Sequence, residues 1–128
     1  MIIAVSASTP DLDGDVDPRF GRCRYLIVIN TETMAFEAVD NSSSMSAGGA
    51  GISAVQQISN KGVQALLTGN CGPNAYQALS AAETKVITGV SGKIKQAVQM
   101  YKSGDLQAAS SANVTEHFGI GKGTVSEK

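Results

Sequence analysis

The chain has 128 residues, the size of one domain with a single hydrophobic core. Hydrophobic residues make up 42% of it and charged residues 16%, a composition typical of folded globular proteins and unlike that of disordered chains. Ten basic and eleven acidic residues give a net charge of −1, so no overall positive field attracts nucleic acid or anionic lipid. The apolar run 1–5 has no basic leader and is too short for a signal peptide or a membrane span, so we expect a cytoplasmic protein.

Three strands are predicted in the first third of the chain. The run 2–7 is apolar and rich in β-branched residues, and the loop with proline and glycine that follows it indicates a buried strand. A second apolar run, 25–30, is joined by a short turn to the run 35–40, in which Phe36 and Val39 lie among polar neighbours. This pattern predicts a β-hairpin.

Helices and strands alternate in the rest of the domain. Apolar residues at helical spacing predict the helices, and short apolar runs predict the strands. Proline at a helix start, serine at a cap and glycine after a helix end set the boundaries. The predicted elements are a helix from Gly51 to about Lys61, a strand over 63–68, a helix that Pro73 begins, a strand over 85–88, and a helix that Ser91 caps and Gly104 ends.

The resulting order, β-β-β-α-β-α-β-α, predicts an α/β fold. A hairpin followed by right-handed crossovers gives a five-stranded mixed sheet with three helices, distributed over both faces. The domain is expected to cover 1–106. Residues 107–128 are rich in Ala, Ser, Gly and Lys, contain the only histidine, His117, and are expected to form a flexible tail.

The loop after the first strand carries the densest positive charge in the chain. In an open α/β sheet, ligands bind outside the carboxyl ends of the parallel strands, so the loops after the first, fourth and fifth strands are expected to share one mouth. Arg19, Arg22 and Arg24 lie close together in the first of these loops, and guanidinium groups bind anions through several N–H donors. The alternative is a solvated basic turn with Phe20 tucked into the core.

Glycine-rich segments precede all three predicted helices. Glycine allows a ligand to approach the backbone, and a helix start presents N–H groups that have no partner within the helix. The candidate binding residues after the fourth strand are Asn70, Cys71, Gly72, Pro73 and Asn74. The other two helix starts contribute Gly48 and Gly49, and Thr88 and Gly89. We therefore expect three helix N-termini to converge on an anion, unless the glycines serve backbone geometry alone.

The sequence does not fit the motifs of several well-defined binding and catalytic sites. Residues 11–15 begin like a calcium loop, but Val16 stands where glycine is required and Arg22 stands where a bidentate glutamate belongs. The glycine loops have neither the ending of a P-loop nor the GxGxxG turn of a dinucleotide site. A single histidine excludes multi-histidine metal sites and leaves little support for hydrolase triads.

The two cysteines, Cys23 and Cys71, form no CxxC unit, so the sequence predicts neither a zinc site nor a disulfide framework. Cys71 lies at a helix start and Cys23 lies among arginines, and both surroundings favour the thiolate. Either is therefore a candidate metal ligand or reactive thiol. Two small buried thiols are an equally open interpretation.

Four segments resemble the dinitrogenase iron-molybdenum cofactor biosynthesis family, in the family's order and spacing. They are DPRFGR (17–22), GAG (49–51), LTGNCGPNA (67–75) and TGVSG (88–92), and the match spans nearly all of 1–106. The resemblance implies a ribonuclease-H-like three-layer fold and a protein that carries or receives iron-molybdenum cofactor precursors. The chain looks most similar to the small free-standing members of the orange-protein type, which hold a molybdenum-copper sulfide cluster.

We therefore expect non-covalent carriage of an anionic molybdenum-sulfur cluster, of Mo-Cu-S or Fe-Mo-S type, by a protein that is not an enzyme. Arg19, Arg22 and Arg24 would neutralise the cluster, and backbone N–H groups of the glycine loops would hold its sulfides. The expected soft or apolar walls are Phe20, Met45 and Pro73. Cluster-donor or cluster-acceptor proteins are the expected partners, with neither nucleic acid nor a membrane.

Two other classes of function stay open. One is a regulatory or scaffold module that binds a protein through the same mouth, and the other is a thiol redox protein that uses Cys23 or Cys71. Nuclease activity, which the fold name suggests, is excluded, because metal-dependent nucleases of that fold need carboxylates on the central strands and the run 3–7 supplies none.

Overall fold

The computed structural model describes residues 1–41 and 50–106, so Met45, Gly48, Gly49 and the predicted tail 107–128 lie outside the described residues. The elements are β1 (Ile2–Ala7), β2 (Tyr25–Asn30), β3 (Phe36–Asp40), α2 (Ala50–Ser59), β4 (Ala65–Leu67), α3 (Pro73–Ala81), β5 (Lys85–Ile87) and α4 (Ile94–Lys102). Over the described residues, the predicted order β-β-β-α-β-α-β-α is confirmed.

The five strands form one mixed sheet in the order β3-β2-β1-β4-β5. β1, β4 and β5 are parallel, whereas β2 runs antiparallel to β1 and β3. The register sets Ala7 opposite Tyr25, and Leu67 opposite Ile87. The carboxyl ends of the three parallel strands therefore lie at one edge of the sheet, which we call the carboxyl edge.

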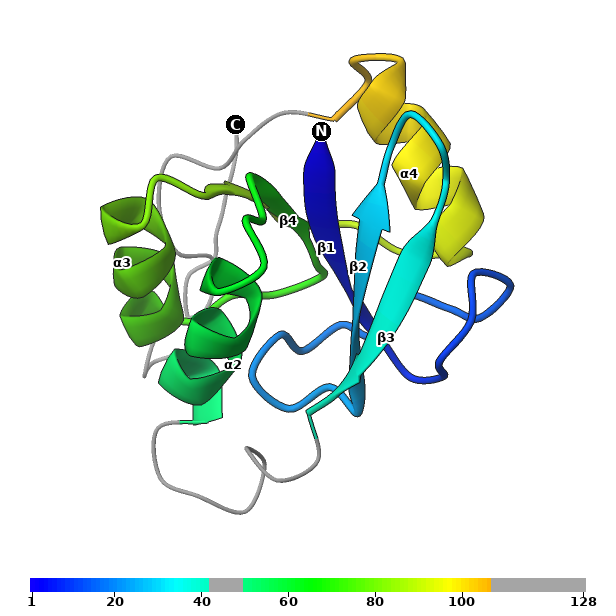
Figure 1. Ribbon diagram of the computed structural model, residues 1–128. Coiled ribbons are helices and arrows are strands. Elements are labelled where there is room, and N and C mark those ends of the chain that lie inside the picture. The colour runs from blue at the N-terminus through cyan, green and yellow to red at the C-terminus, as the bar shows by residue number, and fades with distance from the viewer. Residues whose placement is uncertain (42–49, 107–128) are drawn as a thin grey trace.

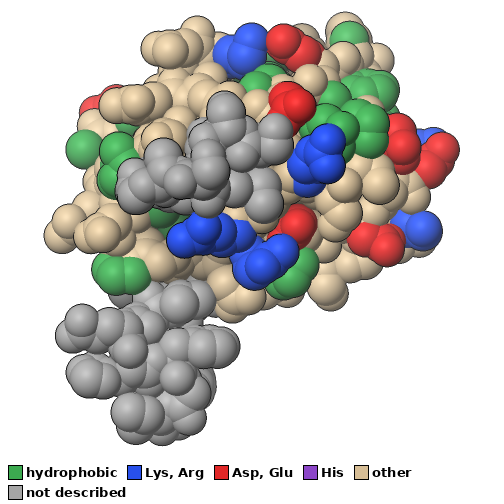
Figure 2. All heavy atoms as spheres, turned by 90° about the horizontal axis from the view of Figure 1, so that it is seen from below, with side chains coloured by type: hydrophobic (Ala, Val, Ile, Leu, Met, Phe, Trp, Pro, Cys, Tyr) green, Lys and Arg blue, Asp and Glu red, His purple; other side chains and the backbone are tan. Residues whose placement is uncertain are grey.

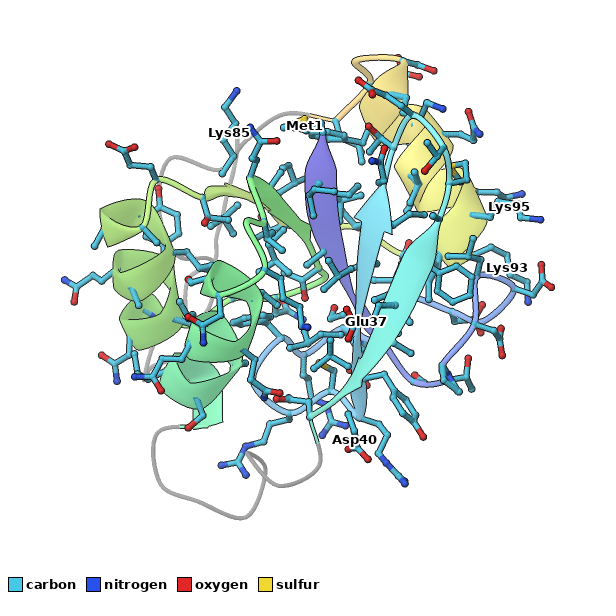
Figure 3. All side chains as sticks on the ribbon, viewed as in Figure 1. Met1, Glu37, Asp40, Lys85, Lys93 and Lys95 are labelled. Carbon is cyan, nitrogen blue, oxygen red and sulfur yellow. The ribbon has the colours of Figure 1, made fainter. Side chains whose placement is uncertain are left out.

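The end of β3 lies at this edge too, because Asp40 pairs with Tyr25. Asp40 is at the lower end of the sheet in Figure 3, whereas Met1 and Lys85 are at the upper end. Each segment that leads from a strand into a helix starts at the lower end. The fold thus gathers the long connections of the chain at the carboxyl edge.

Helices cover both faces of the sheet, with α2 and α3 on one face and α4 on the other (Figure 1). Alternate strand residues supply the two cores. Ala4, Leu26 and Leu66 face α2 and α3, and Ile3 and Ile27 belong to the core under α4. β1 is buried along nearly its whole length because it lies between the two helical layers. This is the predicted three-layer arrangement.

Element boundaries agree to within a few residues, with β4 and β5 shorter than predicted. One predicted cap is wrong. The residue that caps α4 is Lys93 and not Ser91, and no side chain donates or accepts a capping hydrogen bond there. Gly92 adopts φ +88, a left-handed conformation that separates Ser91 from the helix start.

Candidate anion-binding site

The loop that carries the arginines, 17–24, lies directly on the loop that follows β4. Arg19 and Asn70 form a parallel β-bridge, and the backbone N–H of Phe20 donates to the Asn70 carbonyl at 3.3 Å. The side-chain amide of Asn70 donates in turn to the Pro18 carbonyl at 2.9 Å. The two predicted anion-binding segments therefore share the carboxyl edge and are joined to each other by backbone contacts.

Gly69 makes this contact possible. A Cβ atom at position 69 would lie 2.7 Å from Cα and 3.0 Å from the carbonyl oxygen of Pro18. Both of those atoms belong to the backbone and cannot rotate away, so only glycine fits between the loops. Its role is close packing of two loops against each other, which the sequence did not predict for this glycine.

A buried polar cluster lies beneath the loops. The Ser6 hydroxyl donates to the Asp17 carbonyl at 2.7 Å and also pairs with the Thr68 hydroxyl at 2.8 Å. The Asp17 carboxylate accepts from the Arg19 backbone N–H at 2.9 Å and lies 3.7 Å from the Arg19 Nε. Since β1 and β4 are neighbours, this cluster fastens the arginine loop to the ends of both strands.

The three arginines project from this fastened loop. The Arg19 side chain is 65% exposed, and Arg22 and Arg24 are also exposed. The Arg24 guanidinium lies over the Tyr25 ring, 5.4 Å from its centroid. Seen from below, this face of the molecule shows basic side chains grouped near its middle (Figure 2). An anion in solvent can reach these exposed side chains.

The loop after β5 joins the same edge. The Gly89 N–H donates to the Gly69 carbonyl at 2.9 Å, and the Val90 N–H donates to the Thr68 carbonyl at 3.1 Å. Thr88 is half-buried and Gly89 is exposed at φ +75. The predicted residues of this third loop thus lie beside those of the second.

The helix starts differ from one another, which corrects the expectation that three of them converge. At α4 the first two amides already have partners, because the Ile94 N–H donates to the Gly14 carbonyl at 3.0 Å and the Lys95 N–H donates to the Leu12 carbonyl at 3.1 Å. Lys93 also pairs with Asp15. The first half of the long loop therefore occupies these two amides of the α4 start, and neither is available to an anion in this conformation.

The α3 start is built differently. Its cap is Gly72, which has no side chain to offer the helix amides, and Pro73 has no N–H. The first backbone bond of the helix runs from Tyr76 to the Gly72 carbonyl, so the N–H groups of Asn74 and Ala75 precede that bond. Pro73 and Asn74 are exposed. Of the two helix starts whose preceding loop is described, α3 is the one suited to an anion.

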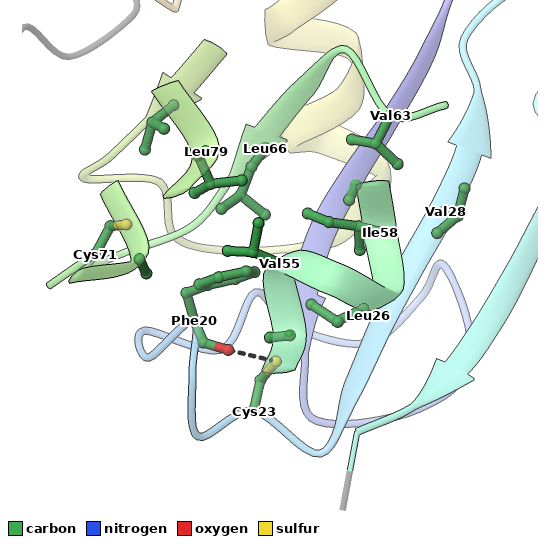
Figure 4. Close-up of a cluster of buried hydrophobic side chains, with 14 residues drawn as sticks. Phe20, Cys23, Leu26, Val28, Val55, Ile58, Val63, Leu66, Cys71 and Leu79 are labelled. Atoms are coloured by element: carbon green, nitrogen blue, oxygen red, sulfur yellow. Dashed lines mark hydrogen bonds between the residues drawn. The ribbon is translucent and has the colours of Figure 1, made fainter. Parts of the chain in front are cut away.

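Phe20 and both cysteines point away from this surface. Phe20 is 1% exposed, and it packs with Cys23 beside Val55 of α2 (Figure 4). Phe20 is thus in the core, as the alternative interpretation of the sequence predicted. In this conformation it does not line a binding site. Its burial anchors the arginine loop and stabilises the folded state by about 2 kcal/mol.

The expectation that the cysteine thiolates are favoured is wrong. Cys23 and Cys71 are 0% and 1% exposed. Burial raises the pKa of Cys23 to about 12, with the Asp17 charge adding to the effect, and burial raises the pKa of Cys71 to about 11. Removal from water is the largest cause at both thiols, and at Cys23 it exceeds the opposing effect of the hydrogen bonds that favour the thiolate. The structure therefore disfavours the thiol redox hypothesis, and neither thiol is prepared to ligate a metal in this conformation.

Three polar residues that support the loops were not identified from the sequence. Ser6 and Asp17 form the buried cluster, and Asn41 fastens the other side of the arginine loop through its hydrogen bond to the Cys23 carbonyl. A polar residue inside or next to an apolar strand run was the available signal, because such a group needs a buried partner. Which partner it finds depends on strand order, which no local pattern contains.

Across 1–41 and 50–106, no three His, Cys, Asp or Glu side chains are grouped so that they could hold a metal ion. Over the same ranges, no helix has the length and apolar character needed to cross a membrane.

Fold and site together define a small α/β protein that carries its anion-attracting groups on loops at one edge of a mixed sheet. The profile of the dinitrogenase iron-molybdenum cofactor family matches residues 1–104. The chain belongs to that family, which confirms the resemblance of the four motifs. An uncharacterized protein of Methanocaldococcus jannaschii is 26% identical over 95 residues, which cover 72% of this chain and 80% of the relative.

Two solved structures are similar over most of their length. The apo form of the orange protein from Desulfovibrio gigas is 46% identical with a TM-score of 0.85, and the match covers 88% of this chain and 95% of that one. An NMR structure of a proposed NifB protein from Thermotoga is 34% identical with a TM-score of 0.73, covering 84% and 91%.

Proposed function

We propose that this chain binds and carries an anionic molybdenum-containing metal-sulfide cluster at the carboxyl edge, without a covalent bond to the protein. The observation that carries the proposal is the bridge between Arg19 and Asn70, which holds the arginine loop against the glycine loop at the start of α3. Membership of the iron-molybdenum cofactor family supports a cluster as the anion. Similarity to the orange protein, whose structure is an apo form, supports a free-standing binding protein.

The groups at this edge suit a polyanion with sulfide ligands. The guanidinium groups of Arg19, Arg22 and Arg24 supply positive charge and directed N–H donors. Backbone N–H groups at the α3 start add donors that need no side chain to ionise. The thiols of Cys23 and Cys71 are buried and protonated. Charge and hydrogen bonding therefore hold the cargo, and such a cargo can leave intact for an acceptor protein.

The proposal assigns binding and release to this protein and no chemical step. Thr88 and Gly89 lie beside Gly69 and extend the same surface. Met45, Gly48 and Gly49 fall outside the described residues and stay predictions from the sequence. The proposed partners are proteins that donate the cluster or receive it.

Reconstitution tests the proposal. Purified protein is incubated anaerobically with tetrathiomolybdate and copper, or with an iron-molybdenum cofactor extract, and is then passed through gel filtration. We expect charge-transfer absorption and molybdenum to elute with the protein. Metal analysis of the eluted protein assigns the cargo to the Mo-Cu-S or the Fe-Mo-S type. Free cluster and colourless protein in both incubations would contradict the proposal.

A charge-matched pair of variants locates the site. The triple variant Arg19→Ala, Arg22→Ala and Arg24→Ala is compared with Lys61→Ala, Lys85→Ala and Lys102→Ala, which removes the same charge from exposed residues at the other end of the molecule. We expect the arginine variant to lose binding by about tenfold or more and the lysine variant to retain it. Equal losses of affinity in the two variants would show that binding depends on net charge alone and not on the arginine loop. If a protein pulled down from lysate is still captured by the metal-depleted arginine variant, the scaffold alternative is favoured.

A further inference from the structure

Asn41, the residue after β3, is buried at 0% exposure, and its polar atoms bond to the arginine loop and to α2. Its backbone N–H donates to the Arg24 carbonyl at 2.8 Å. Its side-chain Nδ2 donates to the Cys23 carbonyl at 3.0 Å and lies 3.8 Å from the Cys23 Sγ. Its Oδ1 accepts from the Gln57 side chain on α2 at 2.7 Å. One buried amide therefore links the end of β3, the arginine loop and α2.

Cys23, whose carbonyl accepts from the Asn41 side chain, lies between two exposed arginines. Cys23 is fixed further by its Sγ, which donates to the Phe20 carbonyl at 3.0 Å. Arg22 and Arg24 thus extend to solvent from either side of a residue whose backbone and side chain are both fastened. A shift of the Cys23 carbonyl would move both guanidinium groups, because they share that stretch of backbone.

We propose that Asn41 is a positioning residue that sets where Arg22 and Arg24 meet the anion. This inference rests on the proposed function, since it assigns Asn41 a role in cluster affinity through the arginines. Residues that hold binding groups in place change affinity without touching the ligand, commonly by about tenfold or more. A residue that only stabilises the fold would lower the melting temperature and leave the affinity of the folded protein unchanged.

Three variants separate these roles. Asn41→Ala removes all the side-chain bonds of Asn41, and Gln57→Ala removes its partner on α2, a milder change that keeps the test possible if the first variant unfolds. Thr84→Val is the matched control. Thr84 is buried and its hydroxyl donates to the Val63 carbonyl at 3.3 Å, near Lys85 at the end of the sheet away from the arginines.

The probe is tetrathiomolybdate with copper, titrated by absorbance well below each melting temperature. We expect Asn41→Ala to weaken binding by about tenfold and Gln57→Ala by about threefold. Thr84→Val should lower the melting temperature with less than about a twofold change in affinity. A folded Asn41→Ala protein with the affinity of the unchanged chain would overturn the inference.

A double-mutant cycle gives the sharper readout. If Asn41 acts through the arginines, Asn41→Ala should change affinity by less than about twofold in a chain that already carries Arg22→Ala and Arg24→Ala. The same tenfold loss in both backgrounds would show that Asn41 acts elsewhere, and the inference would fail while the proposed function stood. If the unchanged chain binds no probe, the proposed function itself fails and takes this inference with it.

Discussion

The side-chain amide of Asn70 donates a 2.9 Å hydrogen bond to the carbonyl oxygen of Pro18, which lies 52 positions earlier in the chain. This bond joins the loop after β4 to the loop after β1, and Gly69 packs against the same proline. The two loops belong to adjacent parallel strands, so the register of the sheet brings them together. The surface proposed to bind the cluster depends on this contact.

Gly69→Ala should destabilise the protein by about 1–3 kcal/mol, because the new methyl group meets the backbone of Pro18 and cannot be relieved by a rotamer change. Urea unfolding followed by circular dichroism measures the loss. The tetrathiomolybdate affinity of the folded variant should also fall, since the loops must separate.

The control for this prediction is Gly72→Ala. Gly72 has φ −73, and a Cβ atom there would meet nothing within 4 Å. Its cost should stay below about 1 kcal/mol, the usual effect of alanine at a helix cap. Equal destabilisation by the two changes would mean that the contact between Gly69 and Pro18 is not tight in solution.

Amide shifts should distinguish the two helix starts. In ¹H–¹⁵N spectra recorded while tetrathiomolybdate and copper are added, we expect the Asn74 amide at the start of α3 to shift strongly. The Ile94 and Lys95 amides should move little, because they already donate to the carbonyls of Gly14 and Leu12. Their hydrogen exchange should also be slower than that of Asn74. Large shifts at α4 would show that the first loop opens to admit the anion.

Protein stability should fall as the pH rises above about 9. Burial raises the pKa of Cys23 to about 12 and that of Cys71 to about 11, against 9.0 for an exposed thiol, so the folded state binds these protons more tightly than the unfolded chain does. The stabilisation is complete below pH 9 and is lost as the pH passes through 11 and 12. Each thiol contributes a slope of about 1.4 kcal/mol per pH unit in that window.

Urea unfolding at pH 8 and pH 10.5 measures this loss. A variant with Cys23→Ala and Cys71→Ala carries every other titrating group and serves as the reference, so its free energy of unfolding should fall less between the two pH values. Parallel declines in the two proteins would argue that the thiols are more exposed than they are in the structure.

The same cysteine variant should keep its affinity for tetrathiomolybdate with copper to within about threefold, since both thiols lie in the core and neither is ionised at neutral pH. Absorbance titration at pH 7.5 is sufficient. Loss of the charge-transfer band with the fold intact would make a thiolate a ligand, and single variants would then identify it.

Much of the fold could be predicted from local patterns. Runs of β-branched apolar residues predicted β1 and β2 with the bounds that the structure shows. Pro73 marked the start of α3 because proline fits the first helical position, and the spacing of the apolar residues in α4 showed which side faces the sheet. Ser91 failed as a cap because the chain reaches the α4 start through a glycine with positive φ.

The candidate site was only partly predictable. Arg19 and the loop of Asn70 could be assigned to one edge, because loops after parallel strands share it. The burial of Cys71 could not be predicted, since a small thiol at a helix start can face solvent or core. Nor could the closing of the α4 start, which depends on Leu12 and Gly14 in a loop with no periodic pattern.

The class of fold, the family and the residues that supply positive charge follow from the sequence, because periodicity, turn residues and short motifs are local properties of the chain. Which of these groups are exposed at the surface depends on how the chain packs in three dimensions. Packing buried Phe20 and the thiols, loop closure occupied the α4 amides, and Asn41 and Asn70 found partners far away in the chain. Each of these outcomes depends on removal of a group from water or on contact between distant segments. Neither can be predicted from the residues that are adjacent in the sequence.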